Sequence, residues 1–289
     1  MASSTKGFLF VFLAAFFWST LGITMRFMNG ENFTSFDVVA VRIVGAGICL
    51  IPLFIRHFPD IRSFPLKLHL LLILYSVTGV ILFYAIELKS FEINPTGIAY
   101  VILYSSPIFV VLSDSLFFKN HLTKSKIISL ALIISGIILI TGIFGNLSLS
   151  ISGLIAAIGS AVFYASYSVW GKYFNDHHLK SELVVCYIFI ISAILMLNFL
   201  PVQKIGNSLS ASTIFSMLYI GIFPTAIAYL LYQKSLKFIS ISQAGITATV
   251  EPVFALVWGI TILGENISGI QTTGIVLILT AIILLKFRE

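Results

Sequence analysis

Long apolar stretches fill most of the chain, and short polar loops separate them. A window of about 19 residues, enough to cross a hydrocarbon core of roughly 30 Å, finds ten such stretches. They cover approximately residues 7–25, 35–55, 66–86, 96–117, 125–143, 153–173, 181–200, 210–232, 242–263 and 269–286. No loop is long enough to hold a folded soluble domain. The pattern therefore predicts an all-α membrane protein with ten transmembrane helices.

Composition supports this class and argues against others. Of the 289 residues, 58% are hydrophobic and 10% are charged, whereas soluble domains carry about 25% charged residues. The net charge of +6 comes from loop residues that form neither a patch nor a tail, so no nucleic-acid partner is expected. Cys49 and Cys186 lie in apolar spans, and the chain lacks CxxC, HExxH, GxSxG and Walker-type motifs. We therefore expect no cofactor, no metal and no catalytic residue.

Lysine and arginine are distributed unevenly over the loops. With the amino terminus in the cytoplasm, thirteen of them fall on inner segments and three on outer segments, and Arg42 lies within a span. The positive-inside rule therefore places both termini in the cytoplasm.

The two halves of the chain repeat each other. Aligned pairs, 145 or 146 residues apart, include Trp18 with Tyr164, Ser90 with Ser235 and Pro107 with Pro252. Each half holds five spans, an odd number, so the second half must enter the membrane from the opposite side. We predict two inverted repeats, residues 1–147 and 148–289, with a binding site near the midplane where they meet.

The ninth span is unusual because it carries Glu251 near its middle, directly before Pro252. A carboxylate inside a membrane is costly unless it faces protein or water, and proline removes a backbone donor. Glu251 is expected to bind a substrate ammonium group, or to exchange a proton as the coupling ion. The alternative is a structural acid bonded to a neighbouring helix. Helical spacing places Gln243, Thr247, Glu251, Phe254 and Trp258 on one face.

Tyrosine and tryptophan extend this candidate site to other spans. The further candidates for substrate binding are Tyr100, Tyr104, Tyr164, Tyr167, Tyr229 and Trp18. The alternative for each is packing against lipid, although a mid-span tyrosine hydroxyl needs a partner that lipid does not offer. Pro107 and Pro252 are expected to mark paired helix irregularities at the site. Arg42 is expected to snorkel or to pair with Asp37 or with an acid on another helix, and the alternative is that it attracts a substrate carboxylate. Asp114 is expected to reach interfacial water.

Several segments resemble the EamA-type domains of the drug/metabolite transporter superfamily. They are LAAFFWSTLGITMRF in the first span, AVRIVGAG in the second and KSLKFISISQAGITATVEPVFALVWGITILGENIS around the ninth. The resemblance covers nearly the whole chain and implies ten helices in two inverted repeats around a central cavity. One departure is that the second half reads Gly264-Glu265-Asn266 where the first reads Lys119-Asn120-His121, so the acid of that helix end occurs once.

The resemblance implies a secondary transporter of small organic metabolites, foremost an exporter of amino acids or related amphipathic compounds in a plasma (inner) membrane. Its partners would be a small-molecule substrate and the lipid bilayer; no oligomeric state is indicated. Other cargo such as sugars, nucleosides or phosphorylated compounds remains an alternative, as does a non-transporting sensor or assembly protein. An intramembrane enzyme would need converging polar residues, for which Asp114 with His121 is the one faint candidate.

Overall fold

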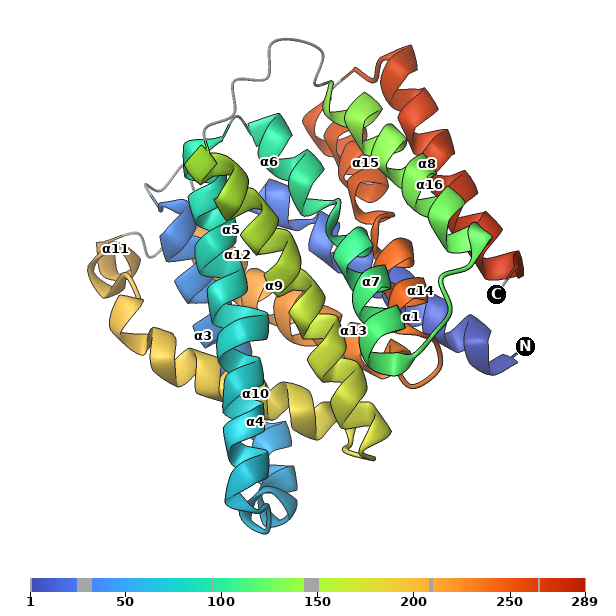
Figure 1. Ribbon diagram of the computed structural model, residues 1–289. Coiled ribbons are helices and arrows are strands. Elements are labelled where there is room, and N and C mark those ends of the chain that lie inside the picture. The colour runs from blue at the N-terminus through green and yellow to red at the C-terminus, as the bar shows by residue number, and fades with distance from the viewer. Residues whose placement is uncertain are drawn as a thin grey trace.

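The computed structural model describes residues 2–24, 33–94, 96–142, 151–207, 210–264 and 266–288, and in these ranges it contains helices and no strand (Figure 1). The helices are α1 (Ala2–Ser19), α3 (Ser35–Arg62), α4 (Leu66–Ser76), η1 (Val77–Ile81), α5 (Leu82–Ile93), α6 (Thr96–Leu103), α7 (Ser106–Phe118), α8 (Lys124–Thr141), α9 (Ile151–Asp176), α10 (Ser181–Met196), η2 (Leu197–Phe199), α11 (Val202–Asn207), α12 (Ala211–Gly221), η3 (Ile222–Ile227), α13 (Ala228–Ser235), α14 (Ile241–Ala248), α15 (Glu251–Leu263) and α16 (Gly269–Arg288). They form 10 apolar segments long enough to cross a membrane, which confirms the predicted all-α fold.

The third and eighth spans each contain a turn of π-helix. In the third span, η1 joins α4 to α5, and in the eighth, η3 joins α12 to α13. The two π-helical turns begin 145 residues apart, at Val77 and Ile222. They therefore occupy equivalent places in the two repeats. A π-helical turn widens the helix and often lies at a functional site.

The fourth and ninth spans are broken in the middle. The fourth divides into α6 and α7 at Tyr104 and Ser105, and the ninth into α14 and α15 at Thr249 and Val250. Pro107 and Pro252 stand in the first turns of α7 and α15. Proline is tolerated there because the first N–H groups of a helix have no intrahelical acceptor. The paired irregularities predicted at the two prolines are thus present.

Equivalent helices of the two repeats pack against each other. The most extensive helix contacts join α8 to α16 and α3 to α10. The α8–α16 pair is antiparallel, because Ser129 donates a hydrogen bond to the carbonyl of Ala281 and Gln271 to that of Ile140. This opposite direction of equivalent helices is the geometry of an inverted repeat. The proposed boundary at residues 147 and 148 lies outside the described ranges.

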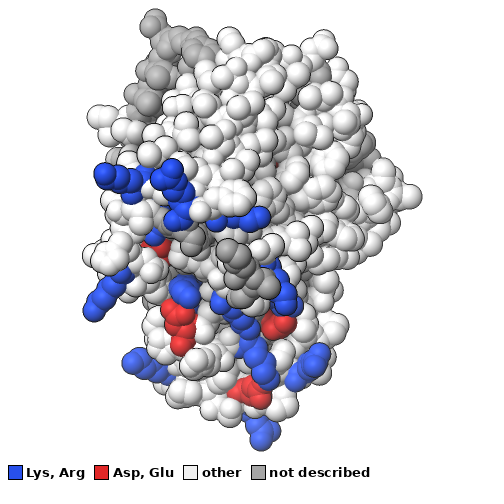
Figure 2. Space-filling view, turned by 90° about the vertical axis from the view of Figure 1, so that its right-hand side faces the viewer, with Lys and Arg blue, Asp and Glu red and all other residues white. Residues whose placement is uncertain are grey.

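The two ends of the chain lie on the same side of the view in Figure 1. We call that side of the bundle the terminal side and the opposite side the distal side. Helix α1 runs parallel to the ninth span, since Gly7 contacts Ile239 and Ser19 contacts Trp258. Figure 2 shows one face on which lysine and arginine side chains lie mainly in its lower half, below a described surface that carries no charge. Such an uncharged zone suits contact with hydrocarbon.

Candidate functional site

A central cavity lies between the two repeats. Its deep part has a cavity volume of about 70 Å³ and is lined by residues of α1, α3, α5, α7, α9, α13, α14 and α15, among others. It extends into a wider outer part with a cavity volume of about 650 Å³. Ser35, Gly22 and Thr141 line this outer part at the distal ends of their spans. The cavity therefore reaches the distal side of the membrane.

Three ionisable side chains line both parts of the cavity: Arg42, Glu87 and Glu251. Glu251 is the first residue of α15, where the positive end of the helix dipole stabilises a carboxylate. Glu87 comes from α5 of the first repeat. Within the described residues no ion pair joins Arg42 to either glutamate. The cavity thus holds one basic and two acidic side chains.

Arg42 is held in place by neutral groups. Its Nε donates to the hydroxyl of Thr225 at 3.2 Å, and a terminal nitrogen donates to the carbonyl of Pro224 at 3.4 Å. Both acceptors belong to the π-helical turn η3. The guanidinium also lies 4.6 Å from the centroid of the Tyr84 ring, within cation–π range.

Aromatic side chains form much of the deep wall. The hydroxyls of Tyr84 and Tyr229 are 2.5 Å apart, and the Trp18 ring packs edge-on against Tyr229 at 5.4 Å. Phe83 makes a similar contact with Tyr164 at 5.6 Å between ring centroids. All five residues line the deep part. A rigid aromatic wall of this kind offers apolar contact and favours cations over its ring faces.

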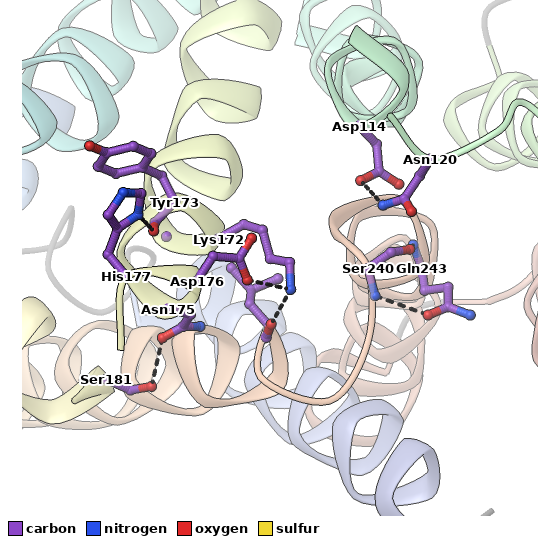
Figure 3. A network of polar contacts seen from close by, with 12 residues as sticks. Asp114, Asn120, Lys172, Tyr173, Asn175, Asp176, His177, Ser181, Ser240 and Gln243 are labelled. Atoms are coloured by element: carbon purple, nitrogen blue, oxygen red, sulfur yellow. Dashed lines mark hydrogen bonds and ion pairs between the residues drawn. The ribbon is translucent and has the colours of Figure 1, made fainter. Parts of the chain in front are cut away.

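The terminal side of the cavity is closed where α7 packs against α14. The Asp114 carboxylate, which is fully buried, accepts a hydrogen bond from Asn120 at 2.9 Å (Figure 3). It also accepts a hydrogen bond from the Ser242 hydroxyl. Lys126 lies 3.7 Å from the same carboxylate. One turn closer to the cavity, Gly245 fits against Val110, and a Cβ on Gly245 would approach the valine to 3.0 Å. We call Asp114, Asn120, Lys126 and Ser242 the terminal latch.

Most of the candidate residues from the sequence gather around the cavity. The deep part is lined by Trp18, Tyr104, Tyr164, Tyr229, Glu251 and Pro107, and the outer part also by Tyr100 and Pro252. These residues lie together because the fourth and ninth spans are both broken beside the cavity and because the two repeats pack against each other around it.

Four candidates lie elsewhere. Thr247 is fully buried and donates to the carbonyl of Gln243, while Gln243 itself caps α14 with Ser240. Trp258 lines a separate apolar groove and donates to Ser19, and Tyr167 packs between other tyrosines. The single face predicted for the ninth span is wrong because the break at Thr249 and Val250 interrupts the helical period.

Two further expectations are corrected. Asp37 pairs with Lys204 at 2.6 Å, so it is not the partner of Arg42, and Arg42 is buried at the cavity rather than snorkelling. Asp114 does not reach interfacial water, since it is fully buried in the terminal latch.

Sequence reasoning missed Glu87 and Tyr84, and it considered a substrate contact of Arg42 as an alternative to snorkelling or pairing. The predicted third span ended at residue 86, whereas the apolar helical span continues to Ser90 and therefore includes Glu87. The repeat spacing that pairs Ser90 with Ser235 also places the segment FYAIELKS on AYLLYQKS, and thereby pairs Tyr84 with Tyr229. Tyr84 was therefore detectable as the repeat partner of a candidate.

Comparison with known proteins supplies the family. The profile of the EamA-like transporter family matches residues 5–142 and again residues 151–287. The chain belongs to this family. The uncharacterized transporter YwfM of Bacillus subtilis is 26% identical to this EamA-family protein over 96% of this chain and 93% of its own. The uncharacterized inner membrane transporter YicL of Salmonella typhimurium is also 26% identical, over 99% of this chain and 97% of its own.

Two more distant matches extend the comparison. The chloroplastic WAT1-related protein At3g02690 of Arabidopsis thaliana is 25% identical over 95% of this chain and 68% of its own. A solved crystal structure superposes with a TM-score of 0.84 at 18% identity, over 98% of this chain and 97% of that one. At 18% identity, the match to the crystal structure shows that the two chains share a fold. Together the family match and the relatives identify this EamA-family protein as a membrane transporter.

Proposed function

We propose that this EamA-family protein is a secondary transporter that exports amino acids or related amphipathic compounds by alternating access. The observation that carries the proposal is the central cavity. It lies between two inverted repeats, takes residues from both, and reaches the distal side while the terminal side is closed. Binding sites of secondary transporters lie at such repeat interfaces and are commonly built from broken helices.

The inverted repeat supports the alternating mechanism. On the terminal side, α7 packs closely on α14. The repeat partners of these two half-helices are α15 and α6, and the outer part of the cavity lies between them, lined by Tyr100 and Leu256 among others. An exchange of the two arrangements would close α6 on α15 and open the terminal side. Each repeat would thus adopt the conformation that its partner has now.

The lining supports a cargo with an ammonium group and an apolar body. Glu87 and Glu251 offer carboxylates, and the tyrosines and Trp18 offer ring faces that attract cations. A phosphorylated cargo is disfavoured, because one arginine faces two glutamates and does not offset the desolvation of a phosphate.

The loop charges, with thirteen lysines and arginines on the terminal side, support a plasma (inner) membrane location with cytoplasmic termini. The distal side would then be the outside. YicL, a relative over nearly the full length, is named as an inner membrane transporter. A cavity that takes up cargo at the terminal side and opens at the distal side would move it outward.

Flux into proteoliposomes under an imposed pH gradient tests the proposal. We expect amino-acid flux by the wild type that responds to the gradient. Glu251→Gln is expected to lower this flux about tenfold or more and to remove the response, because it deletes a charge-assisted contact and a proton site. Glu92→Gln is the matched control, since Glu92 is exposed and pairs with Lys89.

The outcomes separate the parts of the proposal. Full, equally pH-dependent flux by Glu251→Gln would remove Glu251 from the mechanism and leave transport intact. Flux of a phosphate ester without amino-acid flux would reverse the order of cargo classes. No flux of any compound would favour a sensor or assembly role.

A further inference from the structure

Arg42 is a buried charge that forms no direct ion pair with a described residue, although Glu87 and Glu251 of the same cavity interact with it electrostatically at longer range. The residue is 6% exposed and is the eighth residue of the apolar span Ser35–Arg62. An arginine in such a place is costly unless paired, yet its protein contacts are a hydroxyl, a carbonyl and an aromatic ring. Asp37, on the same helix, is engaged by Lys204. Two of the five N–H donors of the guanidinium are used, which leaves three.

The surroundings fix the guanidinium in one orientation. The Thr225 hydroxyl donates to the carbonyl of Ile220 at 2.7 Å, which leaves its oxygen free to accept from Arg42. The Tyr84 ring beneath the guanidinium is tied to Tyr229. A donor group held in this way loses little conformational entropy when a ligand binds.

Arg42 also breaks the symmetry of the two repeats. Helices α3 and α10 begin at Ser35 and Ser181, so the counterpart of Arg42 on α10 is Ile188. The cavity therefore has one guanidinium, on the α3 side, and can orient a polar substrate in one direction.

A second donor points to the same kind of ligand group. The indole N–H of Trp18 is buried and has no acceptor among the described residues. Trp18 lines both parts of the cavity, as Arg42 does. A buried donor without an acceptor is uncommon in native proteins and calls for an explanation such as a ligand.

We propose that Arg42 binds the carboxylate of the cargo, and that the transported compounds therefore carry a free carboxylate. This rests on the proposed transport function. A planar carboxylate matches the fork of the guanidinium, and a single negative charge suits a cavity that already holds two glutamates. The carboxylate lies at Arg42 and the ammonium group of the same cargo lies toward Glu87 and Glu251.

The test compares each cargo with two analogues that lack the free carboxylate. Phenylalanine, leucine and lysine, with their methyl esters and decarboxylated amines, compete for flux of the labelled amino acid in proteoliposomes. In the wild type we expect the free acids to compete roughly 10- to 100-fold better than the esters and amines. In Arg42→Gln we expect the free acids to compete for flux as weakly as the esters do. The competition by the esters is expected to be the same as in the wild type. Arg42→Lys keeps the positive charge but lacks the planar guanidinium. Its preference for acids over esters is expected to lie between that of the wild type and that of Arg42→Gln.

Arg56→Gln is the control, since Arg56 lies on the same helix but is exposed and outside the cavity. Equal competition by acids and esters in the wild type would overturn the inference, as would an equal loss of both in Arg42→Gln. The wild-type ratio decides the question even where a variant does not fold. A wild type that transports none of the compounds would instead contradict the proposed function itself.

Discussion

The hydroxyl oxygens of Tyr84 and Tyr229 lie 2.5 Å apart, and the two residues are 145 positions apart, the spacing of the repeat. Equivalent residues of two inverted repeats meet only beside the axis that relates them. This hydrogen bond therefore marks the axis, at the wall of the deep cavity and directly beneath Arg42. The cavity and Arg42 therefore both lie beside the axis that relates the two repeats.

The pairing of the two tyrosines predicts energetic coupling. Tyr84→Phe and Tyr229→Phe each leave one buried hydroxyl without its partner, which costs about 1–3 kcal/mol. The double variant removes both hydroxyls and is expected to be less destabilised than the sum of the single variants. Unfolding in mixed micelles measures the three free energies. Strict additivity would show that the hydroxyls do not interact.

The terminal latch predicts a conformational bias. Ser242→Ala removes a hydrogen bond from the buried Asp114 carboxylate, which weakens closure of the terminal side. A bond to a charged group is worth about 1.5–3 kcal/mol, so the terminal-open population should rise roughly 10- to 100-fold.

Labelling of Thr249→Cys, a deep-cavity position, by an impermeant thiol reagent from the terminal side measures this change. The background lacks Cys49 and Cys186. Ser235→Ala is the control, because its buried hydroxyl bonds to the carbonyl of Tyr232 within its own helix. Equal labelling in Ser242→Ala and in the control would show that the latch does not hold the terminal side closed.

The close packing of α8 on α16 predicts a stability loss. A Cβ on Gly136 would lie 2.7 Å from the carbonyl oxygen of Gly274 and 2.8 Å from a carbon of Ile278. Gly136→Ala therefore forces the two helices apart, and overpacking of this kind costs about 1–3 kcal/mol. Gly269→Ala is the control, since its Cβ would meet open space. Thermal unfolding in detergent should show a lower midpoint for Gly136→Ala alone.

The ends of the broken spans predict a gain in stability. Lys119 and Gly264, 145 residues apart, both have left-handed backbone conformation, with φ of 57° and 67°. A lysine in this conformation costs about 1 kcal/mol relative to glycine. Lys119→Gly should therefore raise the unfolding midpoint with no change in flux. An unchanged or lower midpoint would contradict this assignment of strain.

The sequence was enough to predict what depends on local pattern. The length of the apolar stretches predicted the ten spans, and the odd number of spans per repeat predicted the inversion. The two prolines indicated where the fourth and ninth spans break beside the cavity. Glu251 was found because a carboxylate in an apolar span is conspicuous.

The rest depends on contacts between distant segments. The position of Arg42 at the cavity depends on the π-helical turn η3, more than 180 residues away along the chain. Asp114 is buried because Ser242 of the other repeat covers it. Thr247 and Trp258 were misplaced because a period of 3.6 residues does not continue through the break at Thr249.

The most direct test of the account is the reactivity of Leu103→Cys with an impermeant thiol reagent added from either side. Leu103 lines both parts of the cavity, and Leu112→Cys, on an exposed apolar position of the same span, is the control. We predict fast labelling of Leu103→Cys from the distal side, slow labelling from the terminal side, and protection by the transported amino acid. Labelling that is equal from both sides, or no faster than at Leu112→Cys, would contradict a cavity that opens to one side between the repeats.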